Sequence, residues 1–343
     1  MPHCNLALLG FGNVGQALAQ LLLKKRQELR RKYNLTFSVT GIATGSHGRA
    51  IDPEGLDLER ALSLIQEGES LDSLSSQPAP QDNLDFIRRC PADVLFENTP
   101  VNYETGQPAV SHLQAALESG MHAITANKGP VVHAYRQLRE LAQAKGLKFF
   151  FESTVMDGAP IFALYREALP GAEIKSFRGI LNSTTNLILS RMESGDSFEE
   201  VVRYAQEIGL AETDPSGDID GWDAAVKVAA LATVVMGSPL KPQDVDRQGI
   251  RQIDAQQVAS AKSQNKRWKL VCSATRQGDR IEARVAPEMV SVDSPLYGVT
   301  GTSSMVQFES DVLGLLSIIE EDPGPQTTAY GLFADFLNAV RAE

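Results

Sequence analysis

Short apolar runs alternate with amphipathic segments over about the first 150 residues of the chain. The apolar runs predict strands, and apolar positions spaced three or four residues apart predict helices between them. The predicted strands are 6–9, 37–44, 94–99, 123–125 and 148–151, and the predicted helices are 14–31, 108–119 and 132–145. Strands that alternate with helices are typical of right-handed βαβ crossovers and a parallel sheet. The Ser/Gln/Pro-rich stretch 73–83 is expected to be a surface loop.

The pattern changes near residue 150, where we place a domain boundary. Ser197 and Glu200 form a capping box that predicts the start of a helix. The turn sequence Gln277-Gly278-Asp279 joins two strand-like segments and predicts a hairpin. The predicted strands are 173–181, 267–275, 280–285, 304–309 and 315–319, and the predicted helices are 185–193, 198–208, 222–236 and a last one from residue 327. This second region is therefore predicted to be α+β.

Composition and charge exclude several classes of protein. A chain of 343 residues suggests about two domains, and 43% apolar with 22% charged residues describes a folded globular protein. The net charge of −11 argues against a nucleic-acid partner, because it repels phosphate backbones. The N-terminus lacks the pattern of a signal peptide, and the longest apolar stretch, near 224–236, is too short to span a bilayer. Three scattered cysteines fit a reducing compartment, so we expect a cytoplasmic protein without a membrane partner.

A glycine-rich turn directly follows the first predicted strand and opens a long predicted helix. In a dinucleotide-binding fold the first glycine makes a tight turn, the second lets the backbone approach a pyrophosphate, and the third lets the helix pack on the strand. The alternative is a tight turn that binds no ligand. The expected cofactor-binding residues of this G-x-G-x-x-G turn are Gly10, Phe11, Gly12, Asn13, Val14 and Gly15.

The end of the second predicted strand bears on the choice of cofactor. NAD-preferring sites usually place an acid there to bind the ribose 2′-hydroxyl, but residues 44–49 contain none. Hydroxyl groups together with Arg49 suit a 2′-phosphate, so we predict NADP, with NAD possible. The alternative is that Arg49 is a solvated loop residue and both cofactors are used.

Residues 193–223 carry ten acidic side chains and one basic side chain, Arg203. The first part of this segment is expected to be a solvated helix face, whereas carboxylates on the Pro/Gly-punctuated part from Gly209 can converge on one point. The helix that follows is apolar all round, which predicts burial, and Lys227 is its only charge. A buried ammonium needs a partner, and Asp223 lies one turn earlier on the same face.

Lys227 has two interpretations. A structural ion pair with Asp223 is the simpler one, but such a pair does not require further carboxylates at the entrance of the helix. Burial favours the neutral amine whereas nearby carboxylates favour the ammonium, so a lysine in this setting suits proton transfer. We therefore take Lys227 as the candidate acid.

Histidine and cysteine are less promising. All five histidines precede residue 134, and each is expected to be an ordinary surface or loop residue. None of the three cysteines suits a thiol nucleophile, because Cys4 opens a strand, Cys90 ends a helix or loop, and Cys272 lies inside a strand. Reduction of an aldehyde or oxidation of an alcohol then remains as the chemistry.

Five motifs follow one another along the chain: Gly10 to Gly15, Thr125-Ala126-Asn127-Lys128, Glu152-Ser153-Thr154-Val155, Gly179 to Asn186, and Gly209 to Lys227. Together they resemble the motifs of homoserine dehydrogenases, which interconvert L-aspartate 4-semialdehyde and L-homoserine with NAD(P)H in threonine and methionine biosynthesis. The resemblance covers nearly the whole chain, and the last motif is highly specific.

The resemblance also implies roles for individual residues. Lys227 is implied to donate the proton to the aldehyde oxygen, and Lys128 to lie beside cofactor and substrate. Glu212 and Asp223 are implied to hold the substrate's amino group. The further residues implied are Asp218 and Thr184 for the substrate, and Thr99, Lys128, Gly209 and Gly324 for the cofactor.

A sodium site held largely by backbone carbonyls is a further implication of the resemblance. It maps onto Glu152, Val155, Asp157 and Ala159, where Asp157 adds a carboxylate that the family pattern lacks. Two other positions depart from the family. Ser183 replaces a usual glycine in the substrate motif, and residues 322–325 replace a more glycine-rich turn that normally approaches the cofactor.

We therefore expect an α/β protein with a Rossmann-type dinucleotide-binding domain at 1–149, onto which the terminal helix 326–343 packs, and an α+β catalytic and dimerisation domain at 150–325. The resemblance implies a homodimer, and no C-terminal regulatory domain is expected. Two other functions stay open. One is an NADP-dependent reductase of another amino-acid semialdehyde or oxo acid, and the other is a catalytically silent NADP-binding regulator.

Overall fold

The computed structural model describes residues 1–341 and divides into two compact units. Unit 1 contains Met1–Gly158 and the C-terminal segment from Gly324, and unit 2 contains Ala159–Pro323. The segment after residue 149, predicted to open the second domain, thus belongs to unit 1. The hydroxyl of Ser153 donates to the carbonyl of Thr328 at 2.7 Å, and this bond ties the segment to the C-terminal helix.

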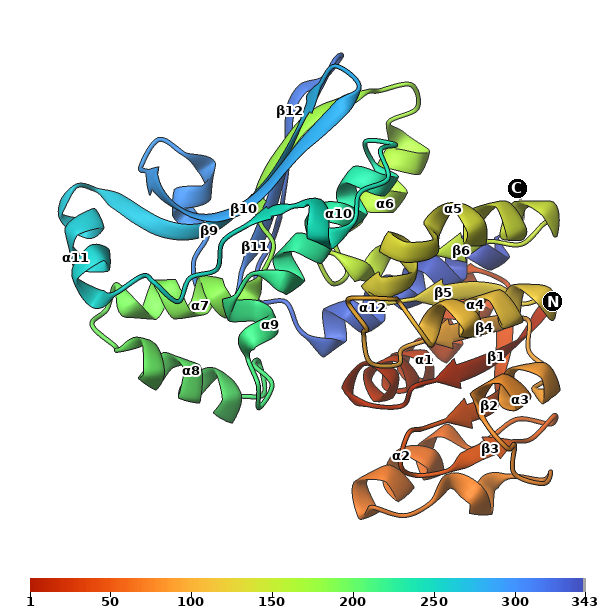
Figure 1. Ribbon diagram of the computed structural model, residues 1–343. Coiled ribbons are helices and arrows are strands. Elements are labelled where there is room, and N and C mark those ends of the chain that lie inside the picture. The colour runs from red at the N-terminus through yellow and green to blue at the C-terminus, as the bar shows by residue number, and fades with distance from the viewer. Residues whose placement is uncertain (342–343) are drawn as a thin grey trace. The chain divides into compact units, whose positions relative to one another are not determined.

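Unit 1 is built on a six-stranded sheet (Figure 1). The strands lie in the order β3-β2-β1-β4-β5-β6, and all neighbours are parallel except β2 and β3. The parallel sheet is therefore as predicted, with β3 as an additional antiparallel edge strand. The strands are β1 (His3–Leu9), β2 (Thr36–Ala43), β3 (Arg49–Ile51), β4 (Val94–Glu97), β5 (His122–Thr125) and β6 (Phe149–Phe150).

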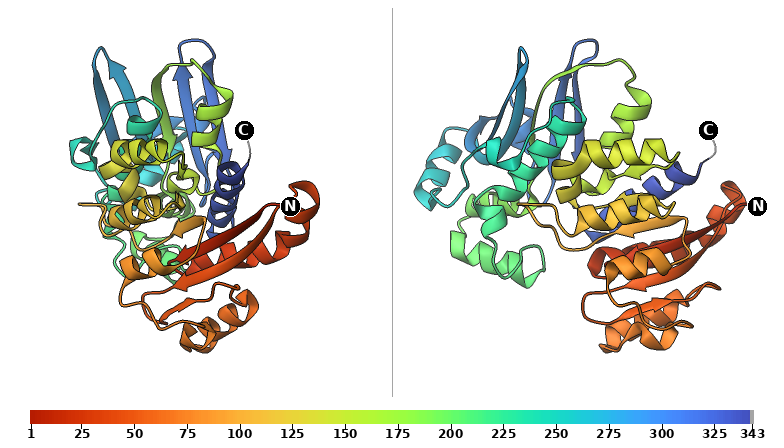
Figure 2. Two further views of the ribbon diagram at one scale, coloured as in Figure 1. Left: turned by 90° about the vertical axis from the view of Figure 1, so that its right-hand side faces the viewer. Right: turned by 45° about the vertical axis from the view of Figure 1, so that its right-hand side comes forward.

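Helices cover both faces of this sheet (Figure 2). Alternation along β1 explains why, since Leu6 and Leu8 join one buried cluster and Ala7 and Leu9 join the other. The first cluster includes side chains of α1 (Asn13–Lys32), α2 (Leu58–Glu67) and α12 (Pro325–Val340). The second includes side chains of α3 (Asn83–Arg89) and α4 (Ala109–Glu118), and α5 (Lys128–Ala144) packs on α4.

Unit 2 is α+β, as predicted, with a second six-stranded sheet in the order β12-β11-β7-β9-β10-β8. The predicted hairpin is present, and Gln277 pairs with Arg280 across its turn. The strands are β7 (Ile174–Ile180), β8 (Asp246–Arg247), β9 (Lys266–Gln277), β10 (Arg280–Ser291), β11 (Ser304–Ser310) and β12 (Gly314–Glu320). The helices are α6 (Ile161–Ala163), α7 (Ser183–Met192), α8 (Phe198–Glu207), α9 (Ser216–Ile219), α10 (Trp222–Val234) and α11 (Ala255–Ser263).

The structure locates two features of the sequence, the predicted capping box and the cysteines. The capping box of Ser197 and Glu200 is formed at the start of α8. Cys4, Cys90 and Cys272 are all buried free thiols. Within residues 1–341, no helix combines the length and apolar character needed to cross a bilayer.

Candidate active site

The glycine turn after β1 leaves space that the chain itself does not fill. A Cβ atom on Gly10, whose φ is +94°, would lie 2.4 Å from the carbonyl oxygen of Asn98. A Cβ on Gly15 would lie 2.4 Å from the carbonyl oxygen of Gly10. A Cβ on Gly12 would meet no atom within 4 Å. The outer glycines are thus required for packing, and the middle one faces open space, as a turn that admits a pyrophosphate requires.

Two further features at this edge of the sheet fit a nicotinamide dinucleotide. Gly12 is the N-cap of α1 and provides no side-chain cap, so N–H groups of the first turn are available for a phosphate. Asn98 follows β4 directly, and both polar atoms of its buried side-chain amide have no hydrogen-bond partner among the described residues. The edge lies where the sheet order reverses, between β1 and β4, which is where such folds bind ligands.

Arg49 opens β3 beside the predicted 2′-phosphate loop. Its Nε donates to Asn83 Oδ1 at 3.1 Å, so the guanidinium is held in one orientation. The structure also adds a carboxylate that the local sequence did not predict. Asp72 Oδ1 accepts a hydrogen bond from the backbone N–H of Arg49 at 3.4 Å. The loop therefore carries both a cation, which suits a 2′-phosphate, and an acid, which suits a ribose hydroxyl.

The predicted cofactor residues Thr99 and Lys128 follow neighbouring strands. Thr99 comes after β4, and its backbone N–H donates to Glu97 Oε1 at 3.1 Å. Lys128 opens α5, which begins before the predicted residue 132 because Asn127 Oδ1 accepts from the N–H of Gly129 at 3.0 Å. Both residues thus stand at the carboxyl edge of the sheet.

One prediction about histidine is wrong. His112 was expected to be a surface or loop residue, but it lies in α4 and is only 3% exposed. Its Nδ1 is 3.6 Å from Glu97 Oε1. The three cysteines, by contrast, behave as expected, because burial raises the pKa of the Cys272 thiol to about 12.

The predicted acid, Lys227, lies in α10, the helix expected to be buried. Its Nζ is 3.3 Å from Asp223 Oδ2 and donates a hydrogen bond to the carbonyl of Leu181 at 2.6 Å. The Lys227 side chain is 15% exposed and that of Asp223 is 8% exposed. The ammonium is thus held at a fixed point and retains access to a small ligand.

Asn182 joins the carboxylates of this cluster. Its Nδ2 donates to Asp218 Oδ1 at 2.6 Å and to Asp223 Oδ2 at 3.0 Å. Its Oδ1 caps α7 by accepting from the N–H of Thr185 at 2.8 Å. Thr184, also buried, donates to Asp218. The structure therefore brings together four predicted residues, Thr184, Asp218, Asp223 and Lys227, and adds Asn182 as the bridge.

Burial raises the pKa of Asp218, and the nearby charge of Asp223 raises it further. Hydrogen bonds from Asn182 and Thr184 act in the opposite direction. Two carboxylates so close together with one lysine attract a second cation. The cluster is therefore suited to hold the ammonium group of an amino-acid substrate.

The raised pKa of Asp218 predicts how stability depends on pH. A carboxyl whose folded pKa lies above its unfolded value stabilises the fold at low pH, and that contribution is lost as the pH rises through the folded pKa. Asp218→Asn should therefore lose less unfolding free energy than wild type as the pH rises from the ordinary aspartate value of 3.8 towards neutrality. Urea titrations of both proteins across this range measure it, and parallel curves would contradict it.

Glu212, the other residue implied to hold the substrate ammonium, differs from this group in its exposure. Its side chain is exposed, and its backbone carbonyl accepts from Gln206 Nε2 at 3.2 Å. Gly209, a predicted cofactor residue, follows α8 in unit 2 with a φ of +72°. Gly324, the other one, is the N-cap of α12 in unit 1.

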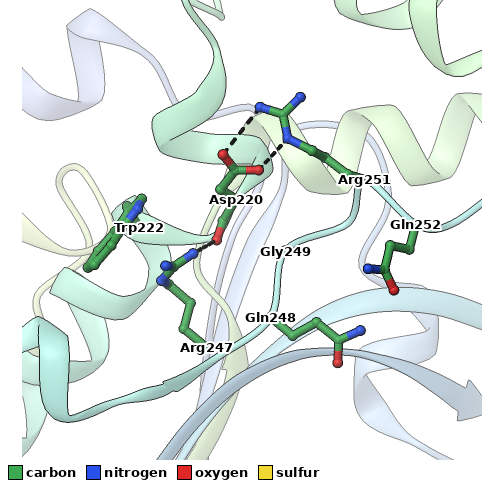
Figure 3. A pocket seen from close by; sticks show the side chains of 7 residues that line it. All are labelled: Asp220, Trp222, Arg247, Gln248, Gly249, Arg251 and Gln252. Carbon is green, nitrogen blue, oxygen red and sulfur yellow. Dashed lines mark hydrogen bonds and ion pairs between the residues drawn. The ribbon is translucent and has the colours of Figure 1, made fainter.

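The turn that leads into α10 is fixed by two arginines (Figure 3). Arg251 binds both carboxylate oxygens of Asp220, at 2.5 and 3.2 Å. Arg247 donates to the backbone carbonyl of Asp220 and stacks on Trp222, 3.8 Å from the ring centroid. These side chains line a cavity of about 260 Å³. Their contacts hold the residues on either side of Gly221, and so the position of Asp223.

The predicted sodium ligands lie where unit 1 ends. Glu152, Val155 and Asp157 belong to unit 1, and Ala159 is the first residue of unit 2. The Asp157 carboxylate already accepts a hydrogen bond from Thr328 Oγ1 at 2.5 Å. Among residues 1–341, no three His, Cys, Asp or Glu side chains gather in a way that could hold a metal ion. Backbone carbonyls would therefore have to supply most of the ligands, and such oxygens suit a hard cation.

A dinucleotide-binding sheet with an open glycine turn, and a lysine held among carboxylates, together define a nicotinamide-dependent oxidoreductase of two units. Comparisons with known proteins give the family. Residues 10–152 match the model of the homoserine dehydrogenase NAD-binding domain, and residues 160–337 match the model of homoserine dehydrogenase. The chain belongs to the homoserine dehydrogenase family, whose members are NAD(P)-dependent oxidoreductases.

Individual homoserine dehydrogenases are similar to this chain over nearly their full length. The NAD(+)-dependent homoserine dehydrogenase of Pseudomonas canavaninivorans is 35% identical over 339 residues, which covers 98% of this chain and 96% of that protein. The crystal structure of a putative homoserine dehydrogenase from Archaeoglobus fulgidus is 31% identical with a TM-score of 0.85, and 98% of each chain is covered. A hyperthermophilic archaeal homoserine dehydrogenase mutant in complex with NADPH is 29% identical with a TM-score of 0.83, and 98% of each chain is covered.

Proposed function

We propose that this protein interconverts L-aspartate 4-semialdehyde and L-homoserine, with Lys227 as the proton donor to the aldehyde oxygen. The observation that carries the proposal is the cluster of Lys227, Asp223, Asn182 and Asp218. When bound, the nicotinamide ring supplies the hydride or accepts it. The chain's own residues bind the substrate ammonium, orient the aldehyde, and move the proton at Lys227 Nζ.

A spectrophotometric assay tests this function. Purified protein with homoserine and NADP or NAD should show growing absorbance of the reduced nicotinamide. The rival reductase of another amino-acid semialdehyde or oxo acid would show turnover with a different alcohol and little with homoserine. A silent cofactor-binding regulator would bind NADPH and turn over none of these substrates.

NADP is the cofactor that we favour, and Arg49 supports it. Arg49 is the first residue of β3, and its Nε is fixed by Asn83, so the remaining donors can make charge-assisted bonds to a 2′-phosphate. Arg49→Ala should therefore raise the KM for NADP by about tenfold and that for NAD by less. Steady-state kinetics with both cofactors measure the two changes. Equal changes would remove Arg49 from cofactor selection and leave Asp72 as the residue to test.

We also propose that a sodium ion binds near Glu152, Val155, Asp157 and Ala159, held largely by backbone carbonyls. Kinetics of the protein in potassium and in sodium buffers of equal ionic strength test it. Identical kinetics and identical melting temperatures in the two buffers would count against the ion.

We also propose a homodimer, and the free edge of β12 supports it. β12 is the last strand of its sheet, and large apolar side chains on it and before it are exposed. They are Val312, Leu313, Leu315 and Ile319. An apolar sheet edge is a surface that proteins normally cover. Light scattering should give twice the chain mass of 37.2 kDa, and a monomer at micromolar concentration would exclude this assembly.

A further inference from the structure

Glu97, the last residue of β4, is fully buried at the carboxyl edge of the unit 1 sheet. Its Oε1 accepts hydrogen bonds from both the backbone N–H and the hydroxyl of Thr99. Its Oε2 accepts from the hydroxyl of Thr125, at 2.9 Å, the residue that faces it in the neighbouring strand. One carboxylate thus joins the ends of β4 and β5.

The bonds continue from Thr125 to the start of α5. Thr125 Oγ1 accepts from the N–H of Asn127 at 2.9 Å, and Asn127 Nδ2 donates to the carbonyl of Thr99 at 3.0 Å. Asn127 also caps α5, of which Lys128 is the first residue. Glu97, Thr125, Asn127 and Thr99 are thus linked in a closed ring of hydrogen bonds. The ring fixes Thr99 and also Asn127, the residue before Lys128.

A series of contacts that begins at Arg49 leads through Asn83 and His112 to the same carboxylate. Because Arg49 Nε donates to Asn83 Oδ1, the Asn83 amide must turn its Nδ2 towards His112 Nε2, 3.5 Å away. Nε2 is then the acceptor of the ring, so the proton lies on Nδ1, which faces Glu97 Oε1. The Glu97 carboxylate therefore accepts hydrogen bonds from Thr99 and Thr125, while His112 Nδ1, at 3.6 Å, faces it from beyond hydrogen-bond distance.

We propose that Glu97 is the positioning residue for the nicotinamide half of the cofactor: its carboxylate holds Thr99 and the Thr125–Asn127 turn in their binding geometry. The proposal rests on the proposed cofactor site at this edge of the sheet, but not on the identity of the substrate. Glu97 acts through Thr99 and Lys128, so it is not itself a catalytic residue.

Glu97→Gln tests the proposal. A glutamine offers one acceptor oxygen and an NH₂ donor, and that donor would face Thr99 or Thr125, which are donors too. We expect the Kd for NADPH, measured by the fluorescence of the bound cofactor, to rise about tenfold. The KM for homoserine at saturating cofactor should change less than threefold. A merely structural role would lower the melting temperature and leave the Kd unchanged.

Thr40→Val is the matched control. Thr40 is also fully buried in unit 1, in β2, and its hydroxyl donates to the carbonyl of Pro91 at 3.2 Å. Its loss should leave NADPH affinity within twofold of wild type. If Glu97→Gln does not fold, Thr125→Val removes the same link with little change of shape. We expect it to raise the Kd about fivefold, which corresponds to about 1 kcal/mol.

A rise in Kd above threefold in whichever of these two variants folds supports the proposal, and a smaller rise overturns it. NADPH binding is measured without substrate, so this result is independent of the reaction. A wild-type protein that binds NADPH but does not oxidise homoserine would refute the proposed function alone. Homoserine turnover with unchanged NADPH affinity in Glu97→Gln would refute the role of Glu97 alone.

Discussion

Lys227→Ala is expected to lower turnover with homoserine by about 10²–10⁴-fold, the usual contribution of a positioned general acid. Hydride that arrives at an aldehyde carbon leaves negative charge on oxygen, and Lys227 Nζ is an ionisable donor held 3.3 Å from Asp223 Oδ2 and hydrogen-bonded to the carbonyl of Leu181. NADPH binding, measured by fluorescence, should be unchanged, because Lys227 lies in unit 2 and the glycine turn lies in unit 1.

Lys227→Arg serves as the matched control for charge. A guanidinium keeps the positive charge beside Asp223 but does not release its proton at working pH, so this variant should not recover turnover. If the alanine variant keeps turnover within tenfold of wild type, Lys227 and Asp223 form only a structural ion pair. Lys128 is then the next candidate acid.

Much of the fold could be predicted from the sequence because its elements carry local signals. The strands β1, β2, β4, β5 and β6 and the helices α1, α4, α7, α8 and α10 follow from apolar periodicity, with ends displaced by a few residues. The start of α5 was not predicted, and several short elements were not predicted at all: α2, α3, α6, α9, α11, β3 and β8. The start of α5 contains Gly129 and Pro130, which indicate a loop, whereas the cap from Asn127 makes a helix there. α11 begins at a capping box formed by Asp254 and Gln257, a local signal that the sequence contains. β3 is three residues long, too short for periodicity to reveal.

The residues of the candidate site also differ in whether local sequence predicts their contacts. Asp223 and Lys227 could be paired from the sequence because they are four residues apart in one helix. Asn182 could not be assigned as the bridge, because its partners lie 36 and 41 residues away and only the tertiary fold brings them together. The contact between His112 and Glu97 could not be predicted for the same reason, since the face of α4 that meets β4 is not marked in either segment.

The burial of Lys269 could not be predicted from the sequence either. This lysine lies in β9, is fully buried, and donates to Asn186 Oδ1 at 2.9 Å and to the carbonyl of Val299 at 2.6 Å. Burial lowers its pKa to about 8. A charged residue within a strand is normally assigned to the solvent side, and only the positions of its two distant acceptors explain why it lies inside.

Asp223→Asn should raise the KM for homoserine by at least about 30-fold, which corresponds to about 2 kcal/mol for one partner lost from a desolvated charge pair. Asp223 contacts Lys227 and Asn182 and is implied to hold the substrate ammonium. An amide at this position removes the negative charge that both Lys227 and the substrate ammonium need. Loss of one partner from a buried pair also costs about 3–5 kcal/mol of stability, so circular dichroism must first show that the variant folds.

Asp220→Asn separates this charge effect from damage to the turn. Asp220 lies three residues earlier, but its carboxylate binds Arg251 at the surface, and the backbone carbonyl that Arg247 contacts is unchanged by the substitution. The homoserine KM of this variant should stay within about threefold of wild type, since an exposed ion pair contributes at most about 1 kcal/mol. An equal rise in both variants would mean that the turn, not the charge of Asp223, controls substrate binding. The contrast isolates the carboxylate that faces Lys227, because both substitutions replace a carboxylate by an amide at positions only three residues apart.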